Sequence, residues 1–178
     1  MLVKRAMSKN VVSVSVPGNR EEVLDLMRKE DKAVLPVVKG ETKIVVGVIT
    51  RSDLINNPDE EQIAMLMTKN PITALPSEDV RDVAKKMIEN DIRRVPVVDD
   101  EGELVGIITS FDLVAQALTK TDIDDAIENY MITTVPTTWD QTPLNVAFET
   151  MKQFGLKSIL ALDDNAKLCG APKIGRAS

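Results

Sequence analysis

Two motifs in the sequence place a hydroxyl and a carboxylate one helical turn apart. They are Thr50-x-x-Asp53 and Thr109-x-x-Asp112, and each follows an apolar run. Such a pair can be a capping box, in which the two side chains satisfy backbone N–H groups at a helix start. It can also form a ligand site, because a helix N-terminus attracts an anion and a nearby carboxylate can accept both hydroxyls of a ribose. Neither pair could break a bond alone, since no partner acid or base lies nearby in sequence.

A pair of arginines, Arg93 and Arg94, stands directly before another apolar run. Guanidinium groups at the mouth of a strand could hold a phosphate. The alternative is an ordinary surface pair, bridged to Glu89 or Asp91. The corresponding positions sixty residues earlier, Ala33-Val34, carry no charge. A phosphate site built on these positions would therefore not be duplicated equally.

The composition excludes several classes of chemistry. None of the 178 residues is histidine, which excludes mechanisms that use imidazole as base, nucleophile or ligand. The single cysteine, Cys169, excludes a multi-cysteine zinc site, and we expect no metal and no catalytic cofactor. With 22 basic against 28 acidic residues and 3% aromatics, the chain lacks the basic patches and stacking platforms typical of nucleic-acid binding.

The apolar runs and the cysteine content indicate a compartment. The segment 1–7 lacks the apolar core of a signal peptide, and no apolar run approaches the roughly 18 residues of a membrane span. A lone cysteine is typical of a reducing compartment. We therefore expect a soluble protein without a membrane partner, located in the cytoplasm.

An internal repeat with a period of about sixty residues organises the chain. Three separate blocks recur at nearly one offset, and they define a first repeat over residues 1–58 and a second over 59–120. The blocks are Met7-Ser8-Lys9-Asn10 with Met67-Thr68-Lys69-Asn70, Pro36-Val37-Val38 with Pro96-Val97-Val98, and Gly47 to Leu54 with Gly106 to Leu113.

A third, more degenerate copy occupies residues 121–170. Its opening Tyr130-Met131-Ile132-Thr133 and its later Leu168-Cys169-Gly170 match the second repeat at an offset of 64. After Gly170 the match stops, and the tail 171–178 contains no Thr-x-x-Asp motif. We interpret repeat three as incomplete, and the divergent tail as a truncation or an artificial extension.

The second repeat shows the order strand, helix, strand, strand, helix. A β-rich stretch at 72–74 precedes Ser77, which is typical of a helix start. Short apolar strands are expected at 95–98 and 104–109, and a second helix from Ser110 to Leu118. The intervening helix carries an apolar stripe at helical spacing, on Val80, Val83, Ala84, Met87 and Ile88, and repeat one has its counterpart on Val23, Leu26 and Met27.

This order, together with Pro-Val-Val and Gly-[Val/Ile]-Ile-Thr-x-x-Asp, resembles the CBS domain, named after cystathionine β-synthase. The resemblance covers residues 1 to about 120 well, and the order of repeats is similar to archaeal proteins made of CBS repeats alone. It implies an α/β fold of tandem repeats, each a small three-stranded sheet with two helices. Two such repeats are expected to pair about a pseudo-two-fold axis and to leave two clefts between them.

The resemblance also implies which residues bind a ligand in these clefts. The aspartates would hold ribose hydroxyls, the threonines and arginines ribose or phosphate oxygens, and apolar segments the adenine. One cleft would combine Thr109, Asp112, Arg93 and Arg94 with a first strand at Val11 and Val12 and with Ala33, Val34 and Leu35. The other would combine Thr50 and Asp53 with Pro71, Ile72 and the turn of Arg94 and Val95.

The function expected from this resemblance is regulatory, in the manner of energy sensing, and not enzymatic. The expected ligand is an adenosine compound, namely AMP, ADP, ATP or S-adenosylmethionine, and the regulated effector protein would be a separate chain. One alternative is an interaction scaffold that dimerises without a small-molecule ligand. The other is an enzyme such as a phosphotransferase, against which the absent histidines and the absent Gly-rich phosphate loop argue.

The third repeat predicts a homodimer. Repeats one and two satisfy each other, whereas repeat three has no fourth copy to cover it. A soluble monomer rarely exposes a large apolar surface, and the same surface of a second chain could cover it. We expect that surface to comprise Leu144, Ala147, Phe148, Met151, Ile159 and Leu160.

Overall fold

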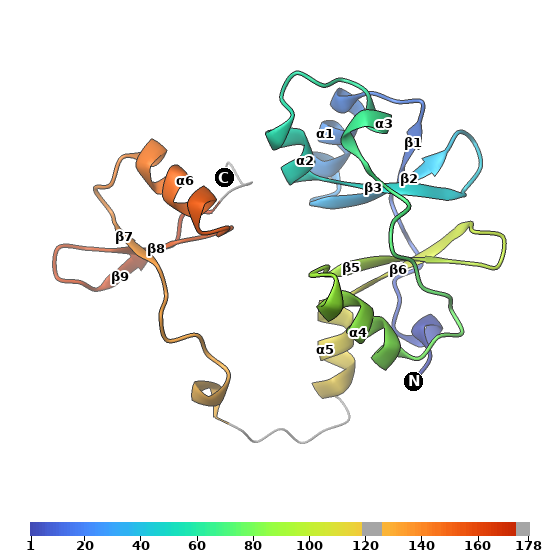
Figure 1. Ribbon diagram of the computed structural model, residues 1–178. Helices are drawn as coiled ribbons and strands as arrows, with labels where there is room; N and C mark the ends of the chain where they lie inside the picture. Colours follow the sequence, from blue (N-terminus) through green and yellow to red (C-terminus); the bar gives the residue numbers. More distant parts are fainter. Residues whose placement is uncertain (119–125, 174–178) are drawn as a thin grey trace. The chain divides into compact units, whose positions relative to one another are not determined.

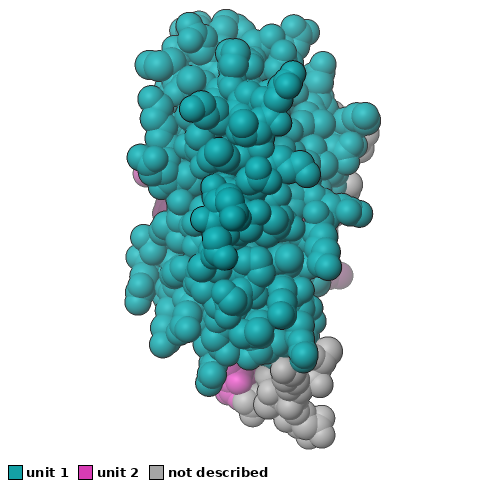
Figure 2. All heavy atoms as spheres, turned by 90° about the vertical axis from the view of Figure 1, so that its right-hand side faces the viewer, with its two compact units in different colours: residues 1–123 teal, residues 124–178 magenta. Residues whose placement is uncertain are grey.

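The computed structural model describes residues 1–118 and 126–173, which belong to two compact units, 1–123 and 124–178. Unit 1 contains both complete repeats, and on the face drawn in Figure 2 its residues form one continuous body. Its elements are η1 (Val3–Arg5), β1 (Val14–Val16), α1 (Arg20–Lys29), β2 (Val34–Lys39), β3 (Val45–Thr50), α2 (Arg51–Asn56), α3 (Ile63–Leu66), β4 (Thr68–Lys69), α4 (Val80–Glu89), β5 (Arg94–Val98), β6 (Leu104–Thr109) and α5 (Ser110–Leu118). The predicted helices and the two strands of repeat two are confirmed.

Repeat one forms a four-stranded sheet in the order β1-β2-β3-β4. Strand β1 runs parallel to β2, while β2–β3 and β3–β4 are antiparallel. The β-branched residues of β2 and β3 fit such a pleated, half-buried surface. The fourth strand, Thr68–Lys69, comes from the opening segment of repeat two.

Repeat two has the same strand arrangement, but its edge strands are shorter. Its two-stranded sheet β5-β6 is flanked by single bridges, a parallel one between Ala74 and Val97 and an antiparallel one between Ser8 and Ile107. The strand expected at 72–74 is therefore reduced to one residue. The second bridge shows that the opening segment of repeat one completes the sheet of repeat two.

Of the two long helices of unit 1, α4 does not begin where the sequence predicts. Helix α1 begins behind a capping box of Asn19 and Glu22, but α4 begins behind Asp79, whose side chain accepts the N–H of Arg81. Ser77 lies two residues too early to cap α4, so the helix start predicted there is wrong. The expected stripe on α4 is also narrower than predicted, because Ile88 is 81% exposed.

The two repeats exchange their opening segments. Val3 of repeat one is fully buried in the core of repeat two, among residues such as Val83 and Val97. Ile63 of repeat two is likewise fully buried in the core of repeat one, beside Val23. Matching backbone bonds hold both segments: the N–H of Val3 donates to the carbonyl of Glu78 (2.9 Å), and that of Ile63 to the carbonyl of Gly18 (3.2 Å).

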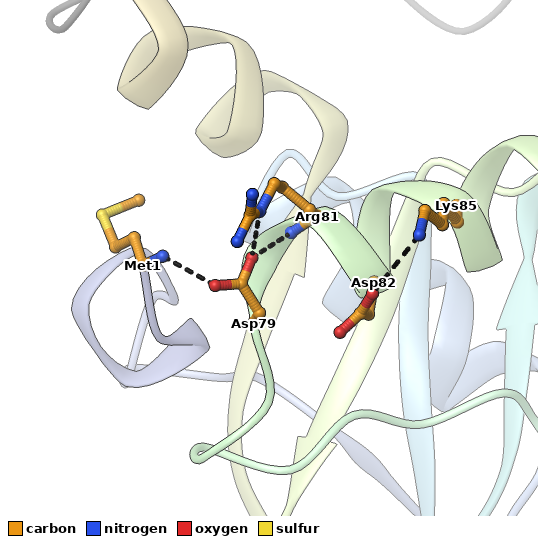
Figure 3. Close-up of polar contacts among 5 residues, drawn as sticks. All are labelled: Met1, Asp79, Arg81, Asp82 and Lys85. Atoms are coloured by element: carbon orange, nitrogen blue, oxygen red, sulfur yellow. Dashed lines mark hydrogen bonds and ion pairs between the residues drawn. The ribbon is translucent and has the colours of Figure 1, made fainter.

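Charges reinforce one of these contacts, at the start of α4 (Figure 3). The α-amine of Met1 lies 2.8 Å from Oδ2 of Asp79, and Nε of Arg81 lies 3.0 Å from its Oδ1. A third pair, Lys85 with Asp82 at 3.6 Å, lies one turn further along the helix. These cations lower the pKa of Asp79, chiefly through the hydrogen bond from Arg81 and then through that from the amine.

Two glycines permit the exchanged segments to approach the sheets closely. A Cβ at Gly47 would lie 2.6 Å from Sδ of Met67, and a Cβ at Gly106 would lie 2.7 Å from Sδ of Met7. Any side chain at either position would clash with a methionine packed over the strand. The Met and Gly blocks that recur in the sequence therefore pack against each other in the structure.

The hairpin tips of the two sheets also pair with each other. The N–H of Val45 donates to the carbonyl of Gly102 (3.0 Å), and that of Leu104 to the carbonyl of Lys43 (2.8 Å). Figure 1 shows α1 and α2 on the outer side of one sheet and α4 and α5 on the outer side of the other. The inner sides of the sheets thus face the middle of unit 1, where a ligand site can form.

Unit 2 has a smaller version of the same plan. It contains η2 (Ile127–Asn129), β7 (Thr137–Trp139), α6 (Leu144–Gln153), β8 (Leu160–Leu162) and β9 (Leu168–Gly170). Strand β7 is parallel to β8, and β8 is antiparallel to β9, as in β1-β2-β3. The linker expected at 119–122 and the end of the tail, 174–178, lie outside the described residues.

The apolar surface expected on unit 2 is partly wrong. Ala147 and Met151 of α6 are buried together with Ile159 and form the interior of the unit itself, while Leu160 is half-buried. Leu144 and Phe148, in contrast, are exposed, at 80% and 38%. The apolar residues of α6 lie on more than one face of the helix, so some of them are buried and others are exposed.

Candidate functional site

Both Thr-x-x-Asp motifs form the capping box that their spacing allows. In the turn from β6 to α5, Oδ2 of Asp112 accepts the backbone N–H of Thr109 (2.8 Å) and its hydroxyl (2.6 Å), and Oγ1 of Thr109 accepts the N–H of Asp112 (3.2 Å). Thr50 and Asp53 repeat this geometry with distances of 2.7, 2.8 and 3.2 Å. The structural interpretation of both motifs is confirmed.

Capping occupies only half of each carboxylate. All of the capping contacts use Oδ2, and in the described part of the chain no residue donates a hydrogen bond to Oδ1 of Asp112 or Asp53. A carboxylate oxygen offers two acceptor lone pairs. The capping box therefore fixes the carboxylate in place and leaves one oxygen available to a ligand.

The turn of Thr109 and Asp112 lines a cavity of about 560 Å³. Three segments surround it: the opening stretch 8–12 of repeat one, the stretch 31–36 at the start of β2, and the paired ends of β5 and β6. Arg94 stands opposite Thr109 in the β5–β6 register, which brings a guanidinium beside the turn. The full lining comprises Ser8, Lys9, Asn10, Val11, Val12, Asp31, Lys32, Val34, Leu35, Pro36, Arg94, Ile107, Thr109 and Asp112.

The cavity concentrates positive charge in an acidic protein. Lys9, Lys32 and Arg94 are cationic, against two carboxylates, whereas the chain as a whole has a net charge of −6. One of the carboxylates, Asp31, lies 4.0 Å from Arg51. Cations gathered in a cleft raise the local concentration of anionic ligands.

The structure brings together most of the residues expected in one cleft. Thr109, Asp112, Arg94, Val11, Val12, Val34 and Leu35 all line the cavity, while Arg93 and Ala33 do not. The expected first strand at Val11 and Val12 is wrong, because β1 begins only at Val14. Arg93 and Ala33 instead contribute backbone carbonyls, which accept the first helical N–H groups of α5 and α2 (2.9 and 3.0 Å).

Of the residues expected in the other cleft, only Arg94 lines this cavity, whereas Thr50, Asp53, Pro71, Ile72 and Val95 do not. Strand β4 pairs with β3, so Pro71 and Ile72 follow a strand beside the Thr50 turn, as Val11 and Val12 follow Ser8 beside the Thr109 turn. Val95 is fully buried in the core of repeat two. Its side chain packs against that core, so its backbone is the part that an occupant of a second cleft would meet.

Sequence reasoning missed the polar side chains that complete the cavity. Ser8, Lys9 and Asn10 belong to a recurring block, but that block received no chemical role. Lys32, a cation two residues before β2, likewise received no role. Its counterpart in repeat two is Ile92, so the two halves of unit 1 differ at this point.

Two further properties are limited to the described residues. They contain no group of three histidine, cysteine, aspartate or glutamate side chains that could hold a metal ion. Within the same ranges, no helix is long and apolar enough to cross a bilayer.

Comparison with known families agrees with this architecture. The CBS domain family model matches the chain twice, over residues 3–60 and 62–119. The chain belongs to the CBS-domain family. Its α/β fold of tandem CBS repeats, paired about a pseudo-two-fold axis, is as expected, and the CBS domain is a regulatory module.

Individual relatives extend this picture. The chain is 29% identical over 133 residues to the uncharacterized protein MJ0188 of Methanocaldococcus jannaschii, covering 72% of this chain and 49% of that protein. The chain thus spans about half the length of this curated relative.

Two solved structures of CBS pairs are similar to unit 1. The CBS domain pair of protein MJ0100, in complex with 5′-methylthioadenosine and S-adenosyl-L-methionine, has 35% identity and a TM-score of 0.62, covering 68% of this chain and 98% of that one. CBSX2 from Arabidopsis thaliana, in complex with AMP, has 27% identity and a TM-score of 0.62, covering 67% and 97%. Both of these CBS pairs are therefore complexes with adenosine compounds.

Proposed function

We propose that unit 1 is a regulatory module that senses an adenosine compound, AMP, ADP, ATP or S-adenosylmethionine, in the cavity at the Thr109 turn. The observation that carries this proposal is the fixed carboxylate of Asp112, which keeps Oδ1 unengaged at the edge of a cavity lined by both repeats. A ligand there would contact residues of both repeats at once. Its binding would therefore favour the paired arrangement over a loosened one.

The lining suggests a role for each group of residues. Oδ1 of Asp112 would accept the ribose hydroxyls, and Thr109 would contact a ribose or phosphate oxygen. Arg94, with Lys9 and Lys32 across the cavity, would hold a phosphate, since guanidinium and ammonium groups form charge-assisted hydrogen bonds with it. The adenine would lie against the apolar residues Val11, Val12, Val34 and Leu35.

A second site of the same kind is part of the proposal. Thr50 and Asp53 share the capping geometry and the unengaged oxygen, and β4 leads Pro71 and Ile72 past them. Arg94 lies near the junction of the repeats and would serve this cleft as well, beside the backbone of Val95. The second cleft has Ile92 where the first has Lys32, so we expect it to prefer a ligand with less negative charge.

The proposed role of the whole protein is energy sensing in the cytoplasm. The ligand would be a signal and not a catalytic cofactor, and the protein would act on a separate effector protein. It would not be an enzyme, because CBS domains are regulatory modules and the sequence contains neither histidine nor a Gly-rich phosphate loop. Incubation with ATP that yields stoichiometric binding and no product separates this function from a phosphotransferase.

Calorimetric titration with adenosine, AMP, ADP, ATP and S-adenosylmethionine tests the proposal. We expect micromolar binding of at least one of them. Asp112→Asn should weaken this binding, because an amide is a weaker hydrogen-bond acceptor for a ribose hydroxyl than a carboxylate. Asp99→Asn is the matched control, because Asp99 caps a turn within the β5–β6 hairpin. Absence of binding to all five compounds would leave the scaffold alternative.

The phosphate contacts have their own signature. Replacement of Arg94 by glutamine should weaken AMP or ATP far more than adenosine, and added salt should reduce the difference. Arg93→Gln is the matched control, because Arg93 does not line the cavity. If adenosine and its nucleotides lose affinity equally, Arg94 is an ordinary surface residue and does not bind phosphate.

A further inference from the structure

Repeat one leaves the outer edge of β1 unpaired. Strand β1 is the first in the order β1-β2-β3-β4, so it has a neighbouring strand on one side only. The carbonyl of Val16 accepts the N–H of Gly40, directly after β2 (2.8 Å), and Val14 faces β2 in the same register. Successive residues of a strand direct their backbone groups to opposite sides. The backbone groups of Ser13 and Ser15 therefore point away from the sheet.

Repeat two closes the same edge with its own side chains. Sixty residues further along the chain, the carbonyl of Thr73 accepts a hydrogen bond from Nζ of Lys86 (3.2 Å). The N–H of Leu75 donates to Oε1 of Glu78 (2.8 Å). Nζ of Lys86 and Oε2 of Glu78 also form an ion pair at 2.7 Å. One ion pair thus satisfies both of the backbone groups that this edge presents.

Repeat one lacks both of these side chains. The position of the lysine holds Leu26, and that of the glutamate holds Gly18. A Cβ at Gly18 would lie 2.5 Å from the carbonyl oxygen of Ser15, so a capping side chain does not fit there. Unit 2 does cap this edge, since the corresponding Trp139 donates its N–H to a threonine hydroxyl (3.2 Å). In the described part of the chain, no residue bonds to the carbonyl of Ser13 or to the N–H of Ser15.

A groove of about 720 Å³ runs along this open edge, between β1 and α1. Ser13, Val14 and Ser15 form one wall, and Leu26 lies among the α1 side chains of the other. None of the residues that line the groove also lines the cavity at the Thr109 turn. The groove is therefore a separate site, and its unpaired backbone groups are suited to an extended peptide.

The two ends of the groove carry opposite charge. Helix α1 runs back along β1, because it joins β1 to the parallel strand β2. Glu22 and Asp25 therefore lie toward the end of β1, and Arg28 and Lys29 toward its start. Asp25 and Arg28 are 3.6 Å apart, but their side chains are 71% and 75% exposed, so this pair is weak. A complementary ligand has an acidic group at the start of β1 and a basic group at its end.

We propose that this groove binds an extended segment of a partner protein as an added strand, parallel to β1. In a parallel strand, a single residue donates its N–H to the carbonyl of Ser13 and accepts the N–H of Ser15. That residue would be apolar, because its side chain would point to the same face as Val14, toward Leu26. The residues two before and two after it share this face. The first would be acidic and the second basic, to match the charges of the groove.

A peptide of this pattern, Ser-Glu-Thr-Val-Thr-Lys-Ser with both ends blocked, tests the proposal by titration into the ¹⁵N-labelled full chain. We expect saturable shifts of the amide signals of residues 13–16 and of α1. N-methylation of the central valine removes the donor to Ser13 and should weaken binding by about 5- to 100-fold. The peptide in which Glu and Lys are exchanged should bind about 2- to 10-fold more weakly, because its charges oppose those of the groove.

Leu26→Lys copies the closure of repeat two onto repeat one. The new ammonium group can reach the carbonyl of Ser13 as Lys86 reaches that of Thr73, and peptide affinity should fall by at least about tenfold. Glu21→Gln is the matched control, because it changes the net charge by the same amount at an exposed position of α1 outside the groove. It should leave peptide binding unchanged, and thermal unfolding should show that both variants remain folded.

The titrations can also contradict the proposal. Absence of saturable shifts in the wild-type chain at millimolar peptide overturns it, and so does equal affinity for the N-methylated peptide. Undiminished binding to a folded Leu26→Lys chain would place the peptide elsewhere. If the same amide signals shift with protein concentration when no peptide is present, the occupant is a second copy of this chain, and the assignment to a partner protein is wrong.

Discussion

Units 1 and 2 share core positions, strand order and register, but they differ in what closes them. In unit 1, Val3 and Ile63 are fully buried because each opening segment has a second repeat to enter. In unit 2 the equivalent Ile127 lies in solvent, and the space over Gly170 is empty of heavy atoms within 4 Å. The comparison shows that one such repeat is an incomplete folding unit. Its last strand and part of its core come from a neighbour.

The largest expected effect contrasts Ile63 with Ile127. Ile63→Ala removes a fully buried side chain and should lower the free energy of unfolding of unit 1 by about 2–5 kcal/mol. Ile127→Ala should change the free energy of unfolding by less than about 0.5 kcal/mol, since the Ile127 side chain is 79% exposed. Urea unfolding of both variants measures the difference. Equal losses would mean that the opening segments are buried to the same extent.

The second comparison contrasts the two Thr-x-x-Asp turns. Asp112→Ala should weaken the adenosine ligand by about 1–3 kcal/mol, or about 5- to 150-fold, because a charged acceptor is lost. Asp53→Ala removes the same cap, so its effect on stability should match, while the cavity at the Thr109 turn keeps its affinity. If the two substitutions together leave nucleotide affinity unchanged in calorimetry, the assignment of both turns to the ligand is wrong.

A third comparison uses the glycines under the methionines. Gly47→Ala should cost about 1–3 kcal/mol of stability, because the new Cβ would lie 2.6 Å from Sδ of Met67 and 2.9 Å from a backbone oxygen of Thr68. Gly170→Ala meets no such atoms and should leave the unfolding midpoint of the isolated chain unchanged. Thermal unfolding at low protein concentration distinguishes the two.

The smallest expected effect is a pH dependence limited to one of the two exchanged contacts. Arg81 and the Met1 amine lower the pKa of Asp79 in the folded protein, so this contact stabilises the fold above the unfolded carboxyl pKa of about 3.9. The contribution is lost as the pH falls below that value. The equivalent Asn19 does not titrate. Urea unfolding between neutral and acidic pH should therefore show a weaker acid dependence in Asp79→Asn and an unchanged one in Asn19→Ala.

Most of the fold of unit 1 could be predicted from the sequence, because local patterns agree with its tertiary structure. The apolar stripe on Val83 and Met87 predicts a helix. The β-branched runs after Pro36 and Pro96 predict strands. The errors fall where tertiary contacts override local preference. Asp79 replaces Ser77 as the helix cap because its carboxylate is also held by Arg81 and the opening segment.

The candidate site was predictable only in part. The Thr and Asp pairs recur with an unmistakable spacing, and their capping geometry is local. Lys9 and Lys32 reach the same cavity only because the opening segment crosses to the other repeat, and that exchange has no local signature. The assignment of residues 121–170 to an incomplete third repeat stays a prediction, since the CBS family model matches residues 3–60 and 62–119.

The exchange of opening segments also constrains when each repeat can fold during translation. Repeat one emerges first, yet its core lacks Ile63 and Leu66 until the start of repeat two has been translated. Val3 waits longer, because its neighbours Val97 and Ile108 lie in the last strands of repeat two. Contacts between residues so distant in sequence slow folding. The segment around Val3 therefore cannot complete its native contacts until Ile108 has left the exit tunnel.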